Sequence, residues 1–219
     1  LEALRSGPSE RFGFTGNAES LLGGCLMDQG RLAEAGPLLR HGYEESAAIL
    51  GADDANTRAI LLRLVRWLER SGDPRAATTL LDSALARAEA RSDDVWTLEL
   101  VREATAWPGL PSEWLATLEV PARAAHARRQ GKSRSYESLA LLMVRLGRPA
   151  EAAALMAAAP EGGSAFVFVA KGIVADAVGD RVAAQAWLER AEAHLNRFPV
   201  ERRQPIAQYH AELRQRLGD

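Results

Sequence analysis

The sequence has a single cysteine, Cys25, among its 219 residues, so an intrachain disulfide is excluded. Its formal net charge is only -2, and no broad positive field favours nucleic acid as a partner. The longest apolar run, residues 165–170, is far too short to cross a bilayer, so we expect no membrane insertion. We expect no signal peptide at the start, because Glu2, Arg5, Glu10 and Arg11 interrupt any apolar run. These absences favour a cytoplasmic protein, or an extracytoplasmic region of a membrane-anchored parent.

Helix-forming residues dominate what is present. Ala, Leu, Arg and Glu are abundant, whereas runs of Val, Ile and Thr, which strands need, are nearly absent. From Asn17 onward helical periodicity is nearly continuous, with short breaks at Gly, Pro and Asp. The sequence therefore predicts an all-α chain, preceded by a mobile lead-in over residues 1–16.

The breaks repeat at corresponding positions. Four segments align on a glycine that is followed five residues later by alanine: Gly30 and Ala35, Gly72 and Ala77, Gly147 and Ala152, Gly179 and Ala184. Four residues after each alanine comes a large apolar residue, and three further on a small one: Leu39 and Gly42, Leu81 and Ala84, Met156 and Ala159, Leu188 and Ala191.

This spacing has a direct physical meaning. A glycine adopts positive φ easily and can end the first helix of a pair. Pro74 and Pro149 stand where a first-turn proline is tolerated. The alanine lets the second helix approach the first closely, and the large residue one turn later fills the space beside it. Each segment thus predicts two antiparallel helices joined by a tight turn.

The pattern resembles the tetratricopeptide repeat, whose two antiparallel helices carry this order of large and small residues. The resemblance covers most of residues 17–84 and 134–194, with departures at Glu19 and Lys171. It implies a right-handed superhelical solenoid of antiparallel helix pairs, an array of about five units over residues 17–198. A degenerate unit would occupy about residues 93–131. Its first helix would start near residues 92–94 and run to about Ala106, and its second would run from Ser112 to about Arg129 and be kinked or interrupted by Pro121.

The last segment, residues 199–219, contains an amphipathic helix with Ile206, Tyr209, Leu213 and Leu217 on one side. An array must cover its final apolar face, so we interpret this helix as a cap. A helix that docks a partner is the alternative.

Residues 19–85 resemble the repeats that follow the kinase domain in bacterial serine/threonine kinases, and the lengthened unit around residues 50–57 resembles those of kinesin light chains. The resemblance implies a protein-protein interaction module within a larger bacterial signalling protein. The alternative is an autoregulatory region of a missing catalytic domain such as a kinase. A third hypothesis, an enzyme on a helical scaffold, would use the tryptophan-rich residues 93–131.

No catalytic or cofactor motif accompanies the repeats. The sequence has no phosphate loop, no H-R-D or D-F-G, and no pair of histidines with metal-ligand spacing, so we predict no enzyme, no cofactor and no metal. Cys25 is expected to be a small core residue rather than a nucleophile. Residues 162–164 read as a turn and helix cap, or else an anion site. A basic stretch around His126, Arg128 and Arg129 complements a helix end, or else contacts a phosphate or acidic peptide.

In tetratricopeptide arrays the first helices of successive units line a concave groove. The resemblance therefore places the partner-binding positions on those helices: Leu62, Arg63, Arg66, Arg70, Leu141, Arg145, Phe166, Val169 and Ile173. A groove that is basic at one end and apolar at the other suits an extended or helical peptide with acidic and hydrophobic anchors. The alternative is that the arginines pair with acidic residues of neighbouring units. The Lys and Asn pattern of relatives that bind chaperone tails is missing.

Overall fold

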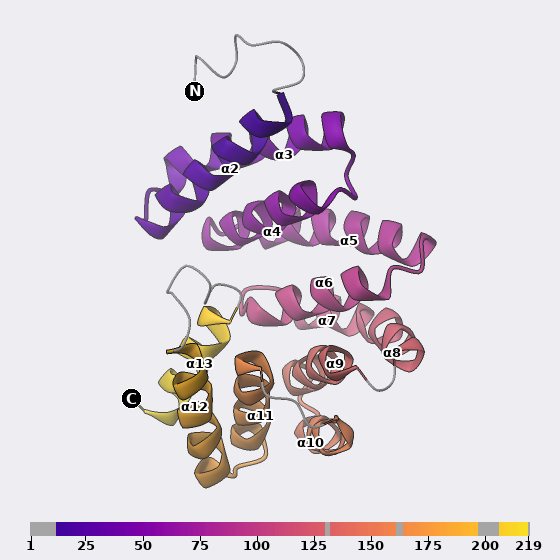
Figure 1. Ribbon diagram of the computed structural model, residues 1–219, viewed down its shortest axis with the longest axis vertical. Coiled ribbons are helices and arrows are strands. Elements are labelled where there is room, and N and C mark those ends of the chain that lie inside the picture. Colours follow the sequence, from indigo (N-terminus) through magenta and orange to yellow (C-terminus); the bar gives the residue numbers. More distant parts are fainter. Residues whose placement is uncertain (1–11, 130–131, 161–163, 197–205, 219) are drawn as a thin grey trace. The chain divides into compact units, whose positions relative to one another are not determined.

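The computed structural model describes residues 12–129, 132–160, 164–196 and 206–218. These residues form α-helices joined by short connections, and no strand occurs among them. The chain divides into two compact units, residues 1–87 and 88–219. The all-α prediction is confirmed, and each unit is described by itself below (Figure 1).

The N-terminal unit contains two helix pairs. The first pair is α2 (Phe12–Asp28) with α3 (Leu32–Leu50), and the second is α4 (Ala55–Arg70) with α5 (Pro74–Ala90), whose last turn passes the unit boundary. Helix α4 packs against both α2 and α3. The indole of Trp67 lies against Gly36 of α3 and its Nε1 donates a hydrogen bond to the Leu32 carbonyl at 2.7 Å, which anchors α4 on α3.

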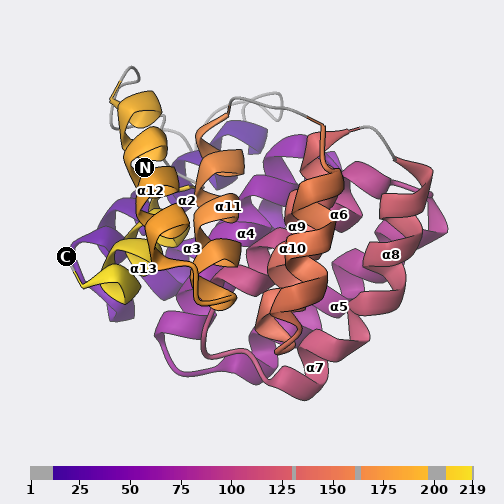
Figure 2. The ribbon, with the colours of Figure 1, turned by 90° about the horizontal axis from the view of Figure 1, so that it is seen from below.

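The C-terminal unit holds the remaining helices, and Figure 2 shows them from below. First helices α6 (Asp94–Ala106), α9 (Ser133–Arg145) and α11 (Ala165–Ala177) pack side by side in that order. Second helices α8 (Glu119–Arg128), α10 (Pro149–Ala158) and α12 (Arg181–Leu195) pack against them, and α7 (Ser112–Thr117) precedes α8. Helix α13 (Ala207–Leu217) closes this unit against α11 and α12. Neighbouring first helices are thus in direct contact, as stacked repeats require.

The four turn glycines have the backbone conformation that the repeat predicts. Gly30, Gly72, Gly147 and Gly179 have φ of 77°, 79°, 73° and 86°. After α4, the N–H of Asp73 donates to the Leu68 carbonyl at 2.9 Å and closes the helix end. A residue with a side chain would be strained at this φ, so glycine at this position of the pattern specifies where each first helix ends.

The predicted small and large positions of the second helices are buried. Ala35, Ala77, Ala152 and Ala184 are all 0% exposed, and Leu39, Leu81, Met156 and Leu188 are buried as well. One small position differs from the prediction. Ala159 is only half-buried, because α10 ends at Ala158 and Ala159 has extended backbone. The repeat pattern therefore predicts burial correctly near the turn, but not at the C-terminal end of α10, the shortest of these four second helices.

The predicted lead-in over residues 1–16 needs a correction. Residues 1–11 lie outside the described residues, but residues 12–16 already belong to α2, and Gly16 is buried. A β-carbon on Gly16 would meet the Gly42 carbonyl at 2.8 Å, and one on Gly42 would meet the Gly16 carbonyl at 2.6 Å. Glycine at position 16 thus permits two helices to touch backbone to backbone, instead of marking a loop.

The degenerate pair begins where the sequence predicts. Helix α6 starts at Asp94 and ends at Ala106, and the carboxylate of Asp93 accepts a hydrogen bond from the Trp96 N–H at 3.0 Å. The second helix is interrupted at Leu118, between α7 and α8. Pro121 causes this break, because it lacks the N–H that would bond the Thr117 carbonyl and its ring crowds that carbonyl.

The predicted C-terminal helix is present as α13, within a segment whose residues 199–205 and 219 lie outside the described residues. Tyr209 and Leu213 are buried, and Ile206 and Leu217 are half-buried. A β-carbon on Gly172 of α11 would lie 2.5 Å from Cδ2 of Leu213, so Leu213 takes the space that a side chain at position 172 would need. The cap interpretation accounts for these contacts.

Candidate functional site

Three arginines form a stripe along α4 in the N-terminal unit: Arg63, Arg66 and Arg70. They are spaced i, i+3 and i+7 and so share one helix face. Arg63 Nη1 donates to Ser20 Oγ on α2 at 3.1 Å. Arg70 Nη1 donates to the Met27 carbonyl at 3.3 Å. The arginine stripe therefore lies beside α2, and its assignment to a binding groove stays a prediction.

Arg70 makes only a long ion pair with its acidic neighbour on α2. The nearest carboxylate oxygen to Arg70 is Asp28 Oδ1, at 3.9 Å from Nη1. Burial, and to a smaller extent the nearby Arg66, lower the pKa of Arg63 from its usual value. Arginine keeps its proton under such perturbation. Like charges held close together favour an anionic partner, which would relieve their mutual repulsion.

Helix α2 also carries apolar side chains that are open to solvent. Leu21 is 49% exposed and Leu22 40% exposed. Cys25 is exposed too, so the prediction that it is a core residue is wrong. Position 25 shares a face of α2 with Leu21 and with Asp28, the residue that approaches Arg70, whereas Leu22 lies on another face. Helices α2 and α4 thus carry an exposed leucine, Leu21, as well as arginine donors.

The predicted binding positions of the C-terminal unit have a different environment. Leu141, Val169 and Ile173 are 2%, 0% and 3% exposed, so their side chains lie within the unit's core. In the N-terminal unit Leu62 is buried as well, at 8% exposed. Four of the nine predicted positions are therefore core residues that a partner does not reach in this structure.

Arg145 and Phe166 are also occupied inside the C-terminal unit. Arg145 donates from Nη1 to the Thr105 carbonyl at 2.8 Å and from Nη2 to the Trp107 carbonyl at 3.0 Å. It thereby satisfies carbonyl groups at the C-terminal end of α6 that have no partner within the helix. The ring of Phe166 meets that of Tyr209 edge to face, with centroids 5.6 Å apart. Both side chains hold the helices of this unit together.

Helix α13 supplies the residue that covers Phe166. The hydroxyl of Tyr209 lies 2.7 Å from Thr105 Oγ1 and donates a hydrogen bond to the Arg102 carbonyl, both on α6. Complete burial raises the pKa of this phenol far above its usual value, so it stays protonated and remains a donor. Gln208 adds a hydrogen bond from Nε2 to the Ala106 carbonyl. The C-terminal helix therefore occupies the face of the C-terminal unit that the resemblance assigned to a partner.

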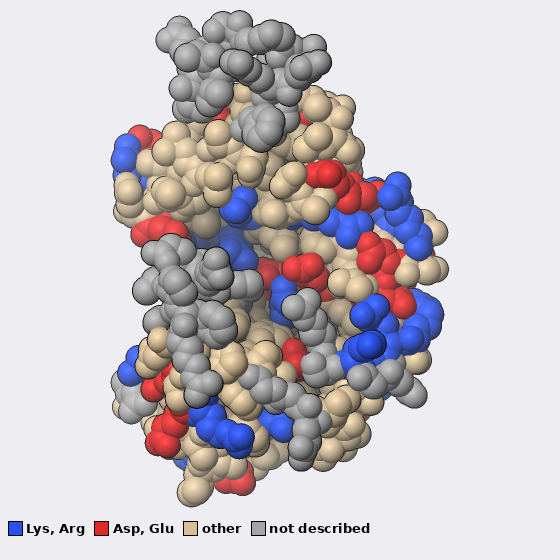
Figure 3. All heavy atoms as spheres, in the orientation of Figure 1, with Lys and Arg blue, Asp and Glu red and all other residues tan. Residues whose placement is uncertain are grey.

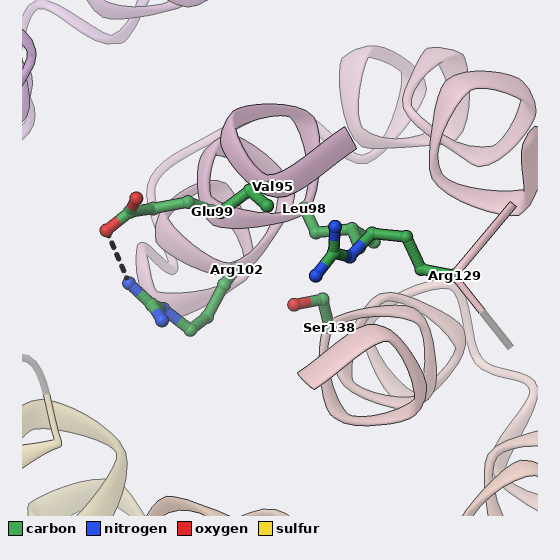
Figure 4. Close-up of a pocket in the computed structure, with 6 residues that line it drawn as sticks. All are labelled: Val95, Leu98, Glu99, Arg102, Arg129 and Ser138. Atoms are coloured by element: carbon green, nitrogen blue, oxygen red, sulfur yellow. Dashed lines mark hydrogen bonds and ion pairs between the residues drawn. The ribbon is translucent and has the colours of Figure 1, made fainter. Parts of the chain in front are cut away.

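One pocket remains open between α6 and α9, close to the end of α8 (Figure 4). It encloses about 70 Å³ and is lined by Val95, Leu98, Glu99, Arg102, Arg129 and Ser138. Arg102 Nη2 donates to Glu99 Oε1 at 3.1 Å. The guanidinium of Arg129 reaches over the pocket towards Ser138, and it has no ion pair among the described residues. A free guanidinium beside apolar walls suits one carboxylate group.

The basic stretch predicted around His126 lies at the end of α8, where Figure 3 shows a group of Lys and Arg side chains. Arg128 pairs with Asp94 in the first turn of α6, with Nη2 to Oδ1 at 2.7 Å. His126 Nδ1 lies 3.2 Å from Ser135 Oγ, and burial lowers its pKa below the usual value. Arg128 and His126 thus have partners on α6 and α9, and the interpretation that the stretch complements its own helix end stays a prediction.

The remaining candidates from the sequence are the possible anion site at residues 162–164, a metal site and a membrane-spanning helix. Residues 162 and 163 lie outside the described residues, and Ser164 caps α11 by accepting from the Val167 N–H at 3.3 Å. Among the described residues, no three His, Cys, Asp or Glu side chains are grouped so that they could hold a metal ion. Within the same residues no helix is long and apolar enough to cross a membrane.

Sequence reasoning missed two arrangements. Arg129 was placed in a basic stretch, but its reach over Ser138 depends on how α8 ends beside α9. The second is an aromatic and cationic group on α11 and α12, in which Phe168 stacks on Trp187 with centroids 5.9 Å apart. Its one sequence signal is Lys171, at a position where the other repeats have leucine.

Comparisons with known proteins agree with the repeat pattern. A family model described as tetratricopeptide repeat matches residues 14–90. A search of curated proteins finds no match. Two crystal structures of kinesin light chain-like TPR repeats from Podosopora anserina, one of them a single-substitution variant, are each 20% identical to the chain. Each match covers 82% of this chain and 94% of the other, with TM-scores of 0.47 and 0.49.

Proposed function

Because a tetratricopeptide-repeat family model matches residues 14–90, we propose that the chain is a protein-protein interaction module whose partner binds on α2 and α4. The observation that carries this proposal is the arginine stripe on α4, which lies beside α2 through the contacts of Arg63 and Arg70. Repeats of this family generally serve as interaction scaffolds. The parent that the resemblance implies, a bacterial signalling protein, is part of the same proposal.

The partner is an extended or helical peptide segment that carries acidic and apolar side chains. Its carboxylates would face Arg63, Arg66 and Arg70, and its apolar groups would cover Leu21 and Cys25. Charged hydrogen bonds to guanidinium are among the stronger ones, and exposed leucines gain from being removed from water. Of the nine positions predicted for binding, the three arginines are the ones that this proposal keeps as contacts.

A peptide array tests the proposal. We expect peptides that combine Asp or Glu with Leu or Phe to bind the full chain, and the double variant Arg63→Gln/Arg66→Gln to lower their affinity about tenfold or more. The matched control is Arg75→Gln on α5, which removes the same charge from an exposed position. If the control weakens binding as much as the double variant does, the attraction is general and the arginine stripe is no binding site.

A further inference from the structure

The observations that go beyond the proposed function lie on α10, α11 and α12 in the C-terminal unit. The rings of Phe168 and Trp187 are stacked at an interplanar angle of 18°. Lys171 Nζ lies 4.7 Å from the centroid of Trp187, and Arg190 Cζ lies 4.6 Å from the same centroid. Arg190 is also 5.1 Å from the Phe168 centroid. We call these four residues the aromatic-cation cluster.

The two cations of the cluster have no carboxylate partner among the described residues. Of the nearby acids, Asp176 pairs with Arg216, whereas Asp180 caps α12 by accepting from the Ala183 N–H and also lines the hollow beside Lys171. Interaction with an aromatic face holds a cation in place without neutralising it. The aromatic-cation cluster therefore presents two positive charges in fixed positions.

An apolar hollow lies next to the cluster. It has a volume of about 290 Å³ and is lined by Ala153, Met156, Ala157, Lys171, Val174, Ala175, Val178, Asp180 and Trp187. Val178 at its edge is 46% exposed. A hollow of this size, with mostly apolar walls, accommodates an aliphatic side chain from another molecule.

The repeat pattern explains why the hollow exists here. At the position eight residues before the turn glycine, Leu64 and Leu139 are 3% and 1% exposed, so in those repeats a leucine fills the packing space. Lys171 holds this position on α11 and extends over Trp187 instead. The aligned position in the second helix carries Leu80 or Leu155 in other repeats and Trp187 here. A pair of leucines is thus replaced by a lysine and an indole, and both of these side chains line the hollow.

We propose that this surface is a second docking site, which takes an acidic segment of a partner protein and receives a leucine-sized side chain in the hollow. The choice of an acidic segment follows from the two unneutralised cations, and the choice of an aliphatic anchor follows from the leucine that the hollow lacks. The site uses none of the residues of the arginine stripe. An experiment can therefore reject one of the two proposals without rejecting the other.

The test uses the whole chain and a blocked synthetic peptide of Asp and Glu with one central Leu. Two matched peptides are compared with it, one with Lys replacing the acids and one with Ser replacing the Leu. We expect the acidic Leu peptide to bind at least about tenfold more tightly than either matched peptide by isothermal titration calorimetry. Equal binding of the three peptides would overturn the proposal.

Two variants locate the contact. Lys171→Leu restores the side chain of the other repeats, so we expect it to keep the fold and lower the affinity about tenfold. Arg190→Gln removes the second charge and should weaken binding by several-fold. Arg75→Gln is the charge control, and Arg66→Gln reports whether the peptide sits on α4 instead.

Each result decides between occupants. Loss of affinity with Lys171→Leu but not with Arg66→Gln supports the docking site. The reverse pattern overturns it while leaving the proposed function intact. Affinity within twofold of the parent chain for both Lys171→Leu and Arg190→Gln also overturns it. A dimer in sedimentation experiments that Lys171→Leu dissociates would identify a second copy of the chain as the occupant and would equally contradict an acidic peptide partner.

Discussion

The first helices of the two units carry different residues at the same repeat position, six residues before the turn glycine. In the N-terminal unit this position is Arg66, which is half-buried and belongs to the arginine stripe. In the C-terminal unit it is Leu141 on α9 and Ile173 on α11, which are 2% and 3% exposed. The same repeat position therefore lies at the surface in the N-terminal unit and in the core of the C-terminal unit.

The difference follows from what covers the first helices. In the C-terminal unit α13 packs on α11, and Tyr209 bonds to the end of α6. An apolar residue under that cover gains from burial, whereas a charged one would lose its hydration. A repeat position thus predicts which helix face a residue occupies, but the presence of a covering helix decides whether that face is a binding surface.

The largest expected effect comes from exchanging the two residue types. Ile173→Arg places a charge without a partner under α13, and we expect it to lower the free energy of unfolding of the C-terminal unit by about 4 kcal/mol or more. The matched variant Arg66→Leu should change stability by about 1 kcal/mol or less. Urea unfolding followed by circular dichroism measures both. Similar losses for the two variants would contradict the assignment of one position to core and the other to surface.

Removing the side chain that fixes α13 should have the next largest effect. Leu213 is 0% exposed and lies over Gly172, so Leu213→Ala is expected to cost about 2–4 kcal/mol. Faster amide hydrogen exchange in α13 and in α11 would accompany this loss. An unchanged exchange pattern would mean that α13 is held by other contacts.

A smaller effect is expected at the contact between α13 and α6. Tyr209→Phe keeps the ring against Phe166 and removes the hydroxyl that bonds to Thr105 and the Arg102 carbonyl. The loss should be about 1–2 kcal/mol, because the hydrogen bonds of a buried hydroxyl to α6 are removed, although Thr105 Oγ1 still donates to the Arg102 carbonyl. Thr105→Val, which removes the facing hydroxyl, gives a double-mutant cycle whose interaction energy should differ from zero.

The smallest predicted effect is a pH dependence in the C-terminal unit. Burial lowers the pKa of His126, so protonation is less favourable in the folded than in the unfolded chain. Stability should therefore decrease as pH falls below the unfolded value of about 6.5, and level off below the folded pKa. His126→Gln should flatten this part of the stability curve. A parent chain whose stability increases over the same range would contradict the sign.

Local features of the fold were predictable because they depend on few residues. Glycine at positions 30, 72, 147 and 179 follows from the need for positive φ, and alanine five residues later follows from close helix packing. The cap at Asp93 and the break near Pro121 follow from the chemistry of single side chains. Each of these signals is contained within one helix or one turn.

Features that depend on distant residues were not predictable. Nothing in the periodicity links Tyr209 to Thr105. The prediction that Cys25 is a core residue is wrong because helix spacing alone does not say which face of α2 a neighbouring helix covers. The core positions Val169 and Ile173 were assigned to a binding groove for the same reason. In the candidate site, the arginine stripe was visible in the sequence, whereas the pocket at Arg129 requires knowledge of where α8 ends.

The bond from Tyr209 to α6 joins residues more than a hundred positions apart in the chain. A linear array can fold by nearest-neighbour steps, each repeat adding to the last. A contact of this sequence separation instead carries a large loop-closure entropy and slows folding. The C-terminal unit should consequently fold in one cooperative step that includes α13, rather than one repeat at a time.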